Sequence, residues 1–468
     1  MLTYDMTQRG NKSLYEFLYE QIRNDILKGH LLKGTKLPSK RKLAEHLSVS
    51  IITVQNAYDL LLAEGYIGSE PRRGYFVAEA VSASFQVSYP TEAKPAVLST
   101  YDVDLVGGSG DVTLMAYSVW AKIMRRVITQ YGKSLLEAME FQGVFRLRSA
   151  IAAYLTDFRG MKIDPVQIIV GAGTEYLYNL LIQLLGRDAV YGYEDPGYRK
   201  IQQIFTVNGV VSRAIPVDAK GMSYTALRES DVSVIHISPA HQFPTGITMP
   251  VGRRQALLGW AYEAQDRYIL EDDYDSEFRF SGKPIRSLFE IDGNDRVIYL
   301  NTFSKTISPS LRISYMVLPK PLMEKFRRTM DFYACTVSSL EQYVLAEYIE
   351  NGSFERHINR CRKLYRQKRD AVVEMIQKSV FSEHVSVDAE DAGLHFLLRI
   401  QSGHSEAELR SMCEACGIRI SFISDYAVCR EVPKCAVINY ASVDLQKLEQ
   451  AIRRLEIILK EKRSSDQN

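Results

Sequence analysis

The chain has 468 residues, of which 46% are hydrophobic and 24% charged, so it is long enough for two or three globular domains. Its 58 basic and 56 acidic residues almost balance, and overall charge therefore indicates neither a nucleic-acid-binding nor a membrane-binding protein. The sequence has no apolar run of about 18 residues and no signal peptide, which predicts a soluble, cytoplasmic protein.

Residues 12–79 are predicted to form a helix-turn-helix unit. A helix with one apolar face is expected to end at Gly29, and a short helix capped by Ser39 should follow it. A turn at residues 48–50 then leads into a second helix that ends near Gly65. Two short helices joined by a tight turn are the arrangement in which the second helix enters the major groove of DNA.

Residues 66–79 alternate around a Pro-Arg-Arg-Gly turn, a pattern that predicts a β-hairpin wing. Residues 1–80 hold 11 Lys or Arg and 9 Asp or Glu, so charge alone would equally fit a solvated basic surface. The basic residues gather at the first short helix and at the wing tip, however, which favours contacts with phosphates. The predicted DNA-binding residues are Lys40, Arg41, Thr53, Gln55, Asn56, Arg72 and Arg73.

Residues 80–100 are predicted to be a linker, because they contain two prolines and no helical periodicity. A segment of this length reaches at most about 70 Å when extended and averages roughly 25 Å as a flexible coil. That reach is enough for the domains on either side to dock on different subunits.

From residue 101 to about residue 460 the chain alternates helices with short apolar strands, which predicts an α/β domain with a mainly parallel sheet. Five buried strands are expected, in IIVGAG, AVYGYED, SVIHIS, RYILEDD and RVIYLNT. A smaller subdomain should begin near residue 335. Cys413 and Cys416 form a CxxC inside an amphipathic helix, and without a second Cys or His pair they predict inert thiols and no metal site.

The segment NTFSKTISPSLRISYM, residues 301–316, places Lys305 among small hydroxyl residues. A lysine amine can form an imine with an aldehyde, and Thr302, Ser304 and Arg312 can hold a phosphate beside it. An aldehyde that carries a phosphate describes pyridoxal 5′-phosphate (PLP). The sequence therefore predicts PLP as the cofactor.

Further residues fit the same ligand. Asp272 can keep a pyridinium nitrogen protonated, and Tyr274 can hydrogen-bond the phenolic oxygen of the ring. Gly173 and Thr174 follow a strand and open a helix, where main-chain N–H groups can bind a phosphate, and Tyr198 can stack on a flat ring. Each residue alone also fits a plain structural role, such as a strand cap or a packing turn. The ordered set favours a PLP site.

The two halves resemble known families. Residues 12–79 resemble the winged helix-turn-helix of the GntR family, and residues 101–460 resemble fold type I aminotransferases. Their fusion resembles the MocR family of bacterial transcription regulators. The resemblance implies PLP attached to Lys305, a head-to-tail homodimer, and an effector that alters affinity for double-stranded promoter DNA. It assigns Asp272 to the pyridinium nitrogen, Tyr274 to the phenolic oxygen, Tyr198 to the ring stack, and Gly173, Thr174, Thr302, Ser304 and Arg312 to the phosphate.

The chain departs from active aminotransferases at three positions. Val437 stands where they carry an arginine that grips the substrate carboxylate, and Phe243 stands where they carry an asparagine before Pro-Thr-Gly. Ala138 stands where the partner subunit usually lends a tyrosine to the phosphate. Without a bidentate clamp an amino acid is poorly oriented for proton transfer, so efficient transamination is not expected and no catalytic residue is assigned. In the DNA module, Ile51 replaces an arginine common at the start of the recognition helix.

The sequence thus predicts a multidomain, PLP-binding transcription regulator. Its effector is expected to be PLP itself, with control of vitamin B6 synthesis, or else an amino compound such as γ-aminobutyrate, taurine or a D-amino acid. Two alternatives remain open from the sequence. One is an active aminotransferase with an accessory DNA-binding module, and the other is a GntR-type repressor whose large domain has lost its cofactor.

Overall fold

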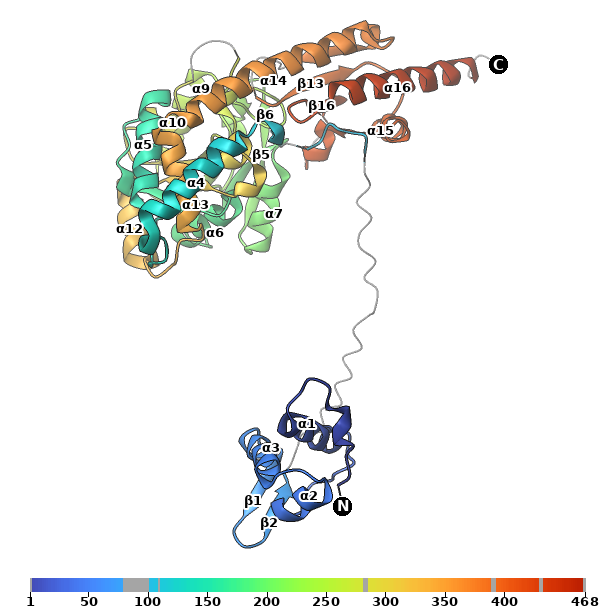
Figure 1. The fold of residues 1–468 in the computed structure, drawn as a ribbon. Coiled ribbons are helices and arrows are strands. Elements are labelled where there is room, and N and C mark those ends of the chain that lie inside the picture. Colours follow the sequence, from blue (N-terminus) through green and yellow to red (C-terminus); the bar gives the residue numbers. More distant parts are fainter. Residues whose placement is uncertain are drawn as a thin grey trace. The chain divides into compact units, whose positions relative to one another are not determined.

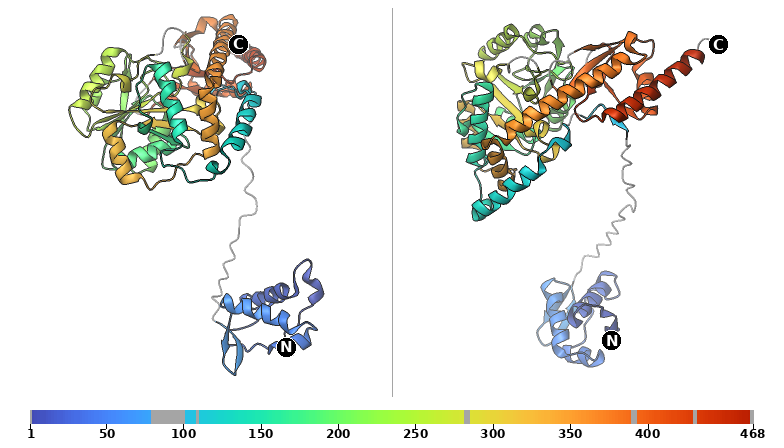
Figure 2. Two further views of the ribbon diagram at one scale, coloured as in Figure 1. Left: turned by 60° about the vertical axis from the view of Figure 1, so that its left-hand side comes forward. Right: turned by 45° about the horizontal axis from the view of Figure 1, so that its top comes forward.

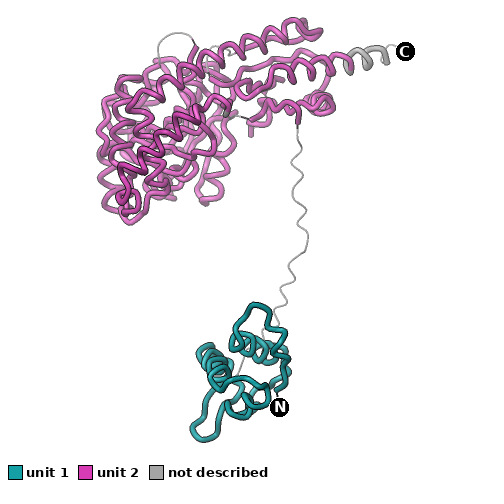
Figure 3. Tube along the Cα trace, viewed as in Figure 1, with its two compact units in different colours: residues 1–98 teal, residues 99–468 magenta. Residues whose placement is uncertain are grey.

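The computed structural model describes residues 2–78, 101–107, 110–280, 285–388, 393–428 and 432–465. The chain divides into two compact units, residues 1–98 and residues 99–468 (Figure 3). The predicted linker at residues 80–100 lies outside the described residues. Among those that are described, no helix combines the length and the apolar character needed to cross a membrane.

The first unit is a three-helix domain with a β-hairpin wing (Figure 1). Its elements are α1 (Leu14–Leu27), α2 (Lys40–His46), α3 (Ile51–Ala63), β1 (Ile67–Glu70) and β2 (Gly74–Val77). The hydroxyls of Ser39 and Ser50 accept main-chain N–H bonds at the starts of α2 and α3, which ends the turn between them and fixes where each helix begins. The two strands pair antiparallel from Ile67 opposite Val77. The winged helix-turn-helix predicted from the sequence is confirmed.

An eight-stranded sheet forms the centre of the second unit, in the order β4-β11-β10-β9-β8-β5-β6-β7. The strands are β4 (Ile168–Gly171), β5 (Tyr191–Asp195), β6 (Ser212–Asp218), β7 (Gly221–Met222), β8 (Val234–Ile237), β9 (Tyr268–Asp272), β10 (Val297–Thr302) and β11 (Ser314–Val317). β11 runs antiparallel to both of its neighbours and β7 antiparallel to β6, whereas the pairs among β10, β9, β8, β5 and β6 are parallel.

All five expected strands are present, as β4, β5, β8, β9 and β10, but β6, β7 and β11 were not predicted. β6 lies toward one edge of the sheet and alternates between buried and partly exposed residues, so it lacks the continuous apolar run of a central strand. β11 is only four residues long and begins inside the segment 301–316 that contains Lys305, whose residues after Thr302 were interpreted as a binding loop.

Helices cover both faces of this sheet (Figure 2). They are α4 (Tyr117–Tyr131), α5 (Phe145–Arg159), α6 (Thr174–Leu185), α7 (Arg199–Val207), α8 (Tyr224–Arg228), α9 (Val251–Tyr262), α10 (Leu288–Ile291), α11 (Phe303–Thr306), α12 (Lys320–Met330) and α13 (Ser339–Glu350). Alternate strand residues face opposite cores: Ile168 and Val170 of β4 pack with α5 and α13, whereas Ile169 between them packs with α6 and α12. This three-layer arrangement is the predicted α/β architecture.

A smaller sheet forms the C-terminal subdomain, in the antiparallel order β12-β13-β16-β15. Its elements are α14 (Ser353–Lys378), β12 (Val385–Asp388), β13 (His395–Ile400), α15 (Glu406–Ala415), β15 (Ser421–Phe422), β16 (Cys435–Asn439) and α16 (Leu445–Ser465). Between α15 and β15, β14 (Ile418–Arg419) pairs in parallel with β3 (Val103–Asp104). Cys413 and Cys416 are both buried, and in the described part of the chain no cluster of His, Cys, Asp and Glu is arranged to hold a metal ion.

Candidate cofactor site and DNA-binding surface

Most of the predicted cofactor residues lie where strands of the large sheet end. Gly173 follows β4, Asp272 is the last residue of β9, and Thr302 is the last residue of β10. Because β4, β9 and β10 run in the same direction, these carboxyl ends lie along one edge of the sheet. Sites of open α/β sheets form at this edge.

One end of the site is suited to an anion. Gly173 has a φ of 94°, a backbone conformation that residues with a Cβ atom rarely adopt, and a Cβ atom there would also meet the Arg312 guanidinium. Arg312 in turn donates to the Glu175 carboxylate at 2.7 Å. Thr174 begins α6, whose first main-chain N–H groups lack helical partners and favour negative charge. The structure therefore brings Gly173, Thr174 and Arg312 together at one helix N-terminus.

Two hydroxyl residues complete this region. Thr302 Oγ1 accepts hydrogen bonds from the Ser304 main-chain N–H at 3.1 Å and from the Ser314 hydroxyl at 2.8 Å. The Ser304 Oγ atom is buried and has no hydrogen-bond partner among the described residues. Because an unpaired buried hydroxyl is costly, this atom fits a ligand oxygen such as that of a phosphate.

Asp272 also has an unused atom. Its Oδ2 accepts from the Tyr178 hydroxyl at 3.2 Å and lies 3.5 Å from Nε2 of His236, whereas its Oδ1 is buried with no hydrogen-bond partner in the described chain. A buried carboxylate oxygen that accepts no hydrogen bond from the described chain fits a ligand that donates an N–H, as a protonated pyridine nitrogen does.

Lys305 lies in α11, directly after Ser304. Burial lowers the pKa of its ammonium group, while the negative charges of Asp275 and Asp272 act in the opposite direction. The net shift is downward, which increases the fraction of neutral amine. A neutral amine is the nucleophilic form that attacks an aldehyde.

The two predicted aromatic contacts differ in their surroundings. Tyr274 donates its hydroxyl hydrogen bond to the main-chain oxygen of His241 at 3.0 Å, and burial raises its pKa well above the ordinary value. Tyr198 immediately precedes α7, is 42% exposed, and meets the ring of Phe243 edge-to-face at 6.0 Å. The Tyr198 ring is therefore accessible for stacking, whereas the Tyr274 hydroxyl would have to share or exchange its present bond to reach a ligand.

Sequence analysis missed several residues that the fold gathers around this site. His241 Nδ1 lies 2.8 Å from Asp275 Oδ2, and its ring is 4.8 Å from that of His395. Burial and the neighbouring His241 lower the pKa of His395 to about 3, so His395 is neutral at physiological pH. These histidines come from different strands and loops, without any regular spacing in sequence. The available signal was local: His241 precedes Phe243-Pro244 directly after a buried strand.

Glu194, near the end of β5, is a further buried group that was not predicted. Its Oε2 accepts the main-chain N–H of Ser238 at 3.2 Å, and its Oε1 is buried without a partner in the described chain. Burial raises its pKa from 4.5 to about 8, with the nearby Asp272 charge adding to the shift. Glu194 is therefore largely protonated in the folded protein at neutral pH.

This raised pKa predicts how stability changes with pH. Between about pH 4.5 and pH 8 the folded state holds a proton on Glu194 that the unfolded chain releases, so stability should fall as pH rises. Glu194→Gln keeps a hydrogen-bonding group without the charge, and should stabilise the second unit at pH 8 by about 1–3 kcal/mol. Both tryptophans, Trp120 and Trp260, lie in this unit, so their fluorescence during urea unfolding at pH 6 and pH 8 measures the effect.

A surface variant, Glu229→Gln, serves as the control for loss of one carboxylate, because Glu229 is exposed. A Glu194→Gln protein with the same pH dependence as wild type would show that the proton on Glu194 is wrongly assigned. Glu271 and Glu277 are also buried, with pKa values raised to about 7. Part of the fall in stability with rising pH should therefore remain in Glu194→Gln.

The position of the missing carboxylate clamp is apolar. Val437 in β16 is 3% exposed and belongs to a cluster that Phe243 and Tyr426 also contact. The Phe243 ring lies 4.9 Å from the Tyr426 ring and 5.2 Å from the His395 ring. No group in this cluster can form a bidentate ion pair with a carboxylate.

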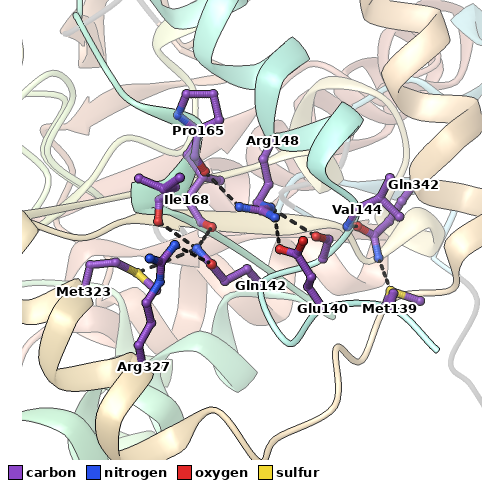
Figure 4. Close-up of polar contacts among 12 residues, drawn as sticks. Met139, Glu140, Gln142, Val144, Arg148, Pro165, Ile168, Met323, Arg327 and Gln342 are labelled. Atoms are coloured by element: carbon purple, nitrogen blue, oxygen red, sulfur yellow. Dashed lines mark hydrogen bonds and ion pairs between the residues drawn. The ribbon is translucent and has the colours of Figure 1, made fainter.

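Ala138 is exposed and precedes a tightly held segment, residues 139–144 (Figure 4). Gln142 donates to two main-chain carbonyls at the start of β4, at 2.8 and 3.1 Å. Arg148 donates through Nε to the main-chain carbonyl of Gly143 at 3.0 Å. The main-chain N–H of Val144 donates to the Gln342 side-chain oxygen at 2.8 Å. The segment is thus fixed by polar side chains, and Ala138 offers no hydrogen-bonding side chain beside it.

The predicted DNA contacts gather on the first unit. Gln55 and Asn56 are exposed on α3, and Arg41 is exposed on α2. Thr53 is half-buried and its hydroxyl lies 2.8 Å from the Ser50 hydroxyl, so it contributes to the cap of α3. Ile51 is 46% exposed in the first turn of the same helix.

The remaining basic residues lie at or near the wing. Lys40 lies over the ring of Tyr75 at 5.2 Å, so its stem packs on β2. Arg72, with a φ of 62°, and Arg73 are exposed at the turn between β1 and β2, and Arg73 forms an ion pair with Glu70. Exposed arginines at a wing tip are placed to contact phosphates.

Comparisons with known proteins agree with this two-part organisation. The family model for bacterial regulatory proteins of the gntR family matches residues 14–77, and that for class I and II aminotransferases matches residues 108–455. The uncharacterized HTH-type transcriptional regulator YdeL of Bacillus subtilis (strain 168) is 39% identical, over 94% of this chain and 96% of its own. The probable rhizopine catabolism regulatory protein MocR of Rhizobium meliloti is 31% identical, over 94% and 93%. The chain belongs to the MocR-type transcription regulators of the GntR family.

Two further similarities are to a pyridoxine biosynthesis regulator and to a solved aminotransferase structure. The pyridoxine biosynthesis regulator PdxR of Corynebacterium glutamicum is 34% identical, over 76% of this chain and 77% of its own. Among solved structures, kynurenine aminotransferase of Pyrococcus horikoshii, crystallised in complex with PMP, has a sequence 26% identical to this chain. The two structures superpose with a TM-score of 0.67, and the match covers 78% of this chain and 92% of the aminotransferase chain. The aminotransferase family and fold indicate pyridoxal 5′-phosphate as the cofactor, as the sequence predicted.

Proposed function

We propose that this regulator binds PLP through Lys305 and couples the occupation of that site to its affinity for promoter DNA. The observation that carries the proposal is a pair of buried polar atoms that have no hydrogen-bond partner among the described residues, Oδ1 of Asp272 and Oγ of Ser304, in the same site as a lysine whose pKa is lowered. One atom accepts an N–H and the other meets an anion, which are the two ends of a pyridine ring carrying a phosphate.

The roles of the remaining residues follow from this orientation. Bound PLP supplies an aldehyde for covalent attachment to a lysine and a ring that absorbs visible light. Gly173, Thr174 and the N-terminus of α6 hold the phosphate with Arg312, whose guanidinium would then share its contacts between Glu175 and the ligand. Thr302 orients the Ser304 main chain beside it. Tyr198 covers the ring, and Tyr274 with His241 lies at its phenolic oxygen.

We further propose that PLP itself is the effector and that the regulated genes belong to vitamin B6 metabolism. The similarity to PdxR supports this assignment, as does the apolar packing of Val437, the position at which active aminotransferases carry the arginine that grips a carboxylate. Adding PLP to the apo-protein should change its affinity for a DNA fragment that the protein selects from a random library. A regulator indifferent to PLP but responsive to γ-aminobutyrate, taurine or a D-amino acid would retain the regulatory role and refute the B6 assignment.

The regulator is also proposed to act as a head-to-tail homodimer. Several large apolar side chains on the second unit are exposed in the single chain, which supports an interface there. Examples are Tyr117 at 65%, Phe145 at 55%, Phe332 at 75% and Leu136 at 89% exposed. Sedimentation analysis of the PLP-bound protein should give the mass of two chains, and a monomer at micromolar concentration would contradict the proposal.

The DNA contacts can be tested by their dependence on salt. Arg41→Ala removes one exposed charge at α2, so it should weaken binding to every sequence and flatten the slope of log affinity against log salt by about one unit. Gln55→Ala should instead change sequence preference and leave the slope intact, because an amide can bond bidentately to adenine. Fluorescence anisotropy at several salt concentrations measures both effects. Normal binding by Arg41→Ala at about 150 mM salt would show that the helix-turn-helix contacts are wrongly placed.

A further inference from the structure

A cavity of the second unit lies in the C-terminal subdomain, among residues that have no part in the cofactor site. It has a volume of about 520 Å³ and is lined by residues of β12, β13, α15, β15 and α16 and by the residues that follow α14. Small-molecule sites in proteins usually measure about 300–1,000 Å³. The space therefore matches a single small ligand.

The lining of the cavity is divided into an apolar body and a polar end. Leu398, Ile400, Leu409, Met412 and Phe422 are among its apolar residues. His384, Gln401, Ser402 and His404 lie together at the polar end, where the Gln401 main-chain N–H donates to the His384 carbonyl at 2.8 Å. The Ser402 Oγ atom is buried and has no hydrogen-bond partner among the described residues. An occupant that offers one hydrogen-bonding group to Ser402 would satisfy it.

The walls of the cavity are joined to the segment by which the chain enters the second unit. α15 carries Leu409 and Met412 on the cavity side and is followed by Gly417, where a Cβ atom would lie 2.9 Å from the Asp102 carboxylate. The Val103 N–H donates to the Gly417 carbonyl at 3.1 Å, and the Leu105 N–H donates to the Arg419 carbonyl at 2.9 Å. A shift of α15 therefore changes the hydrogen bonds that hold β3 at the end of the linker sequence.

We propose that this cavity is a second effector site, for a small and mainly aromatic or aliphatic molecule with one hydrogen-bonding group. Its occupation biases the position of α15 and, through β14 and β3, the segment that leads to the DNA-binding unit. The site is independent of PLP, so the regulator can combine two chemical signals. Coupling of this kind requires only that the ligand bind one arrangement of α15 better than another.

The experiment uses the full-length, PLP-bound protein and 2-naphthol, which has two apolar rings and one hydroxyl. Calorimetric titration should show one site per chain. Leu409→Trp places a larger side chain of α15 in the cavity. It should weaken 2-naphthol binding by about tenfold or more, because the ring and the ligand cannot occupy the same space without the strain of overpacking. Ser411→Trp, on the exposed side of the same helix, is the matched control and should bind as wild type does.

A gentler variant guards against misfolding of Leu409→Trp. Ser402→Ala removes only the buried hydroxyl and should weaken binding about fivefold, as expected for one lost hydrogen bond. The absorption band of bound PLP should be unchanged in all three variants, which separates failure of this site from failure of the proposed function. Saturating 2-naphthol should alter the affinity for the selected DNA fragment in wild type, Ser411→Trp and Ser402→Ala, with about five times more ligand needed for Ser402→Ala, and should have little effect in Leu409→Trp.

Three results would overturn the proposal. Wild-type protein that does not bind 2-naphthol, or a Leu409→Trp variant that binds it as tightly as wild type, would remove the site. Binding at this site that leaves DNA affinity unchanged would overturn the coupling through β3.

Discussion

Replacing Lys305 by alanine should abolish the covalent adduct that borohydride fixes between the protein and PLP. The wild-type protein is expected to be yellow, because the lowered pKa of Lys305 increases the fraction of the neutral amine that attacks an aldehyde, while Asp272 and Ser304 would orient the ring and the phosphate. Absorption spectra and the mass of the protein after borohydride reduction measure the result. Alanine is well tolerated in a helix, so the far-ultraviolet circular dichroism should not change.

Lys320→Ala provides the matched control, since this lysine is exposed at the start of α12. It should leave the adduct and its absorption band as in wild type. Ser304→Ala should retain the covalent bond but bind PLP more weakly, because one contact to the phosphate is lost. Wild-type protein that stays colourless when saturated with PLP would refute the assignment of the site.

Much of the cofactor site could be predicted because its residues follow a simple rule of the fold. Asp272 and Thr302 end two apolar segments that read as parallel strands, and parallel strands bring their carboxyl ends to one edge. Gly173 could be placed in the same way, as the residue after a strand and before a helix. Sequence order alone was sufficient for these positions because the relevant geometry is local to each strand end.

The partners of these residues could not be predicted, because they depend on contacts between distant segments. Tyr178 donates to Asp272 across 94 residues of sequence, and His236 reaches the same carboxylate from β8. Ser314 meets Thr302 only because β11 turns back antiparallel beside β10, a pairing that its short apolar run does not reveal. Burial of Glu194 likewise depends on how the neighbouring strands and loops pack over it.

The same dependence on tertiary contacts explains the second cavity. Its walls come from α15 and from strands of the small sheet, and the CxxC motif within α15 gave no indication of it. Cys413 lines the cavity as a buried thiol, and burial raises its pKa to about 12. A protonated thiol of this kind is a poor nucleophile.

The last prediction separates a regulator from an enzyme: transamination of common amino acids should be slow or undetectable in the wild-type protein. Val437 and Phe243 lie together in an apolar cluster, and Ala138 has no hydrogen-bonding group to offer a phosphate. Each charge-assisted hydrogen bond that is missing costs about 1.5–3 kcal/mol. Loss of two or more would slow the reaction by about a hundredfold or beyond, since about 1.4 kcal/mol corresponds to a factor of ten.

Single-turnover absorption changes after mixing the PLP-bound protein with excess amino acid measure this rate directly. Phe243→Asn returns one polar contact without placing a charge in the apolar cluster. If the missing contacts cause the slow reaction, the absorption change should be faster in this variant than in wild type. Multiple turnovers at about 1 per second or faster, an ordinary enzymatic rate, would instead establish an aminotransferase with an accessory DNA-binding unit. A slow wild-type reaction together with a PLP-dependent change in DNA affinity is the combination that only a regulator should produce. If cellular amino acids do not react quickly with PLP bound at Lys305, the bound PLP remains available as a signal.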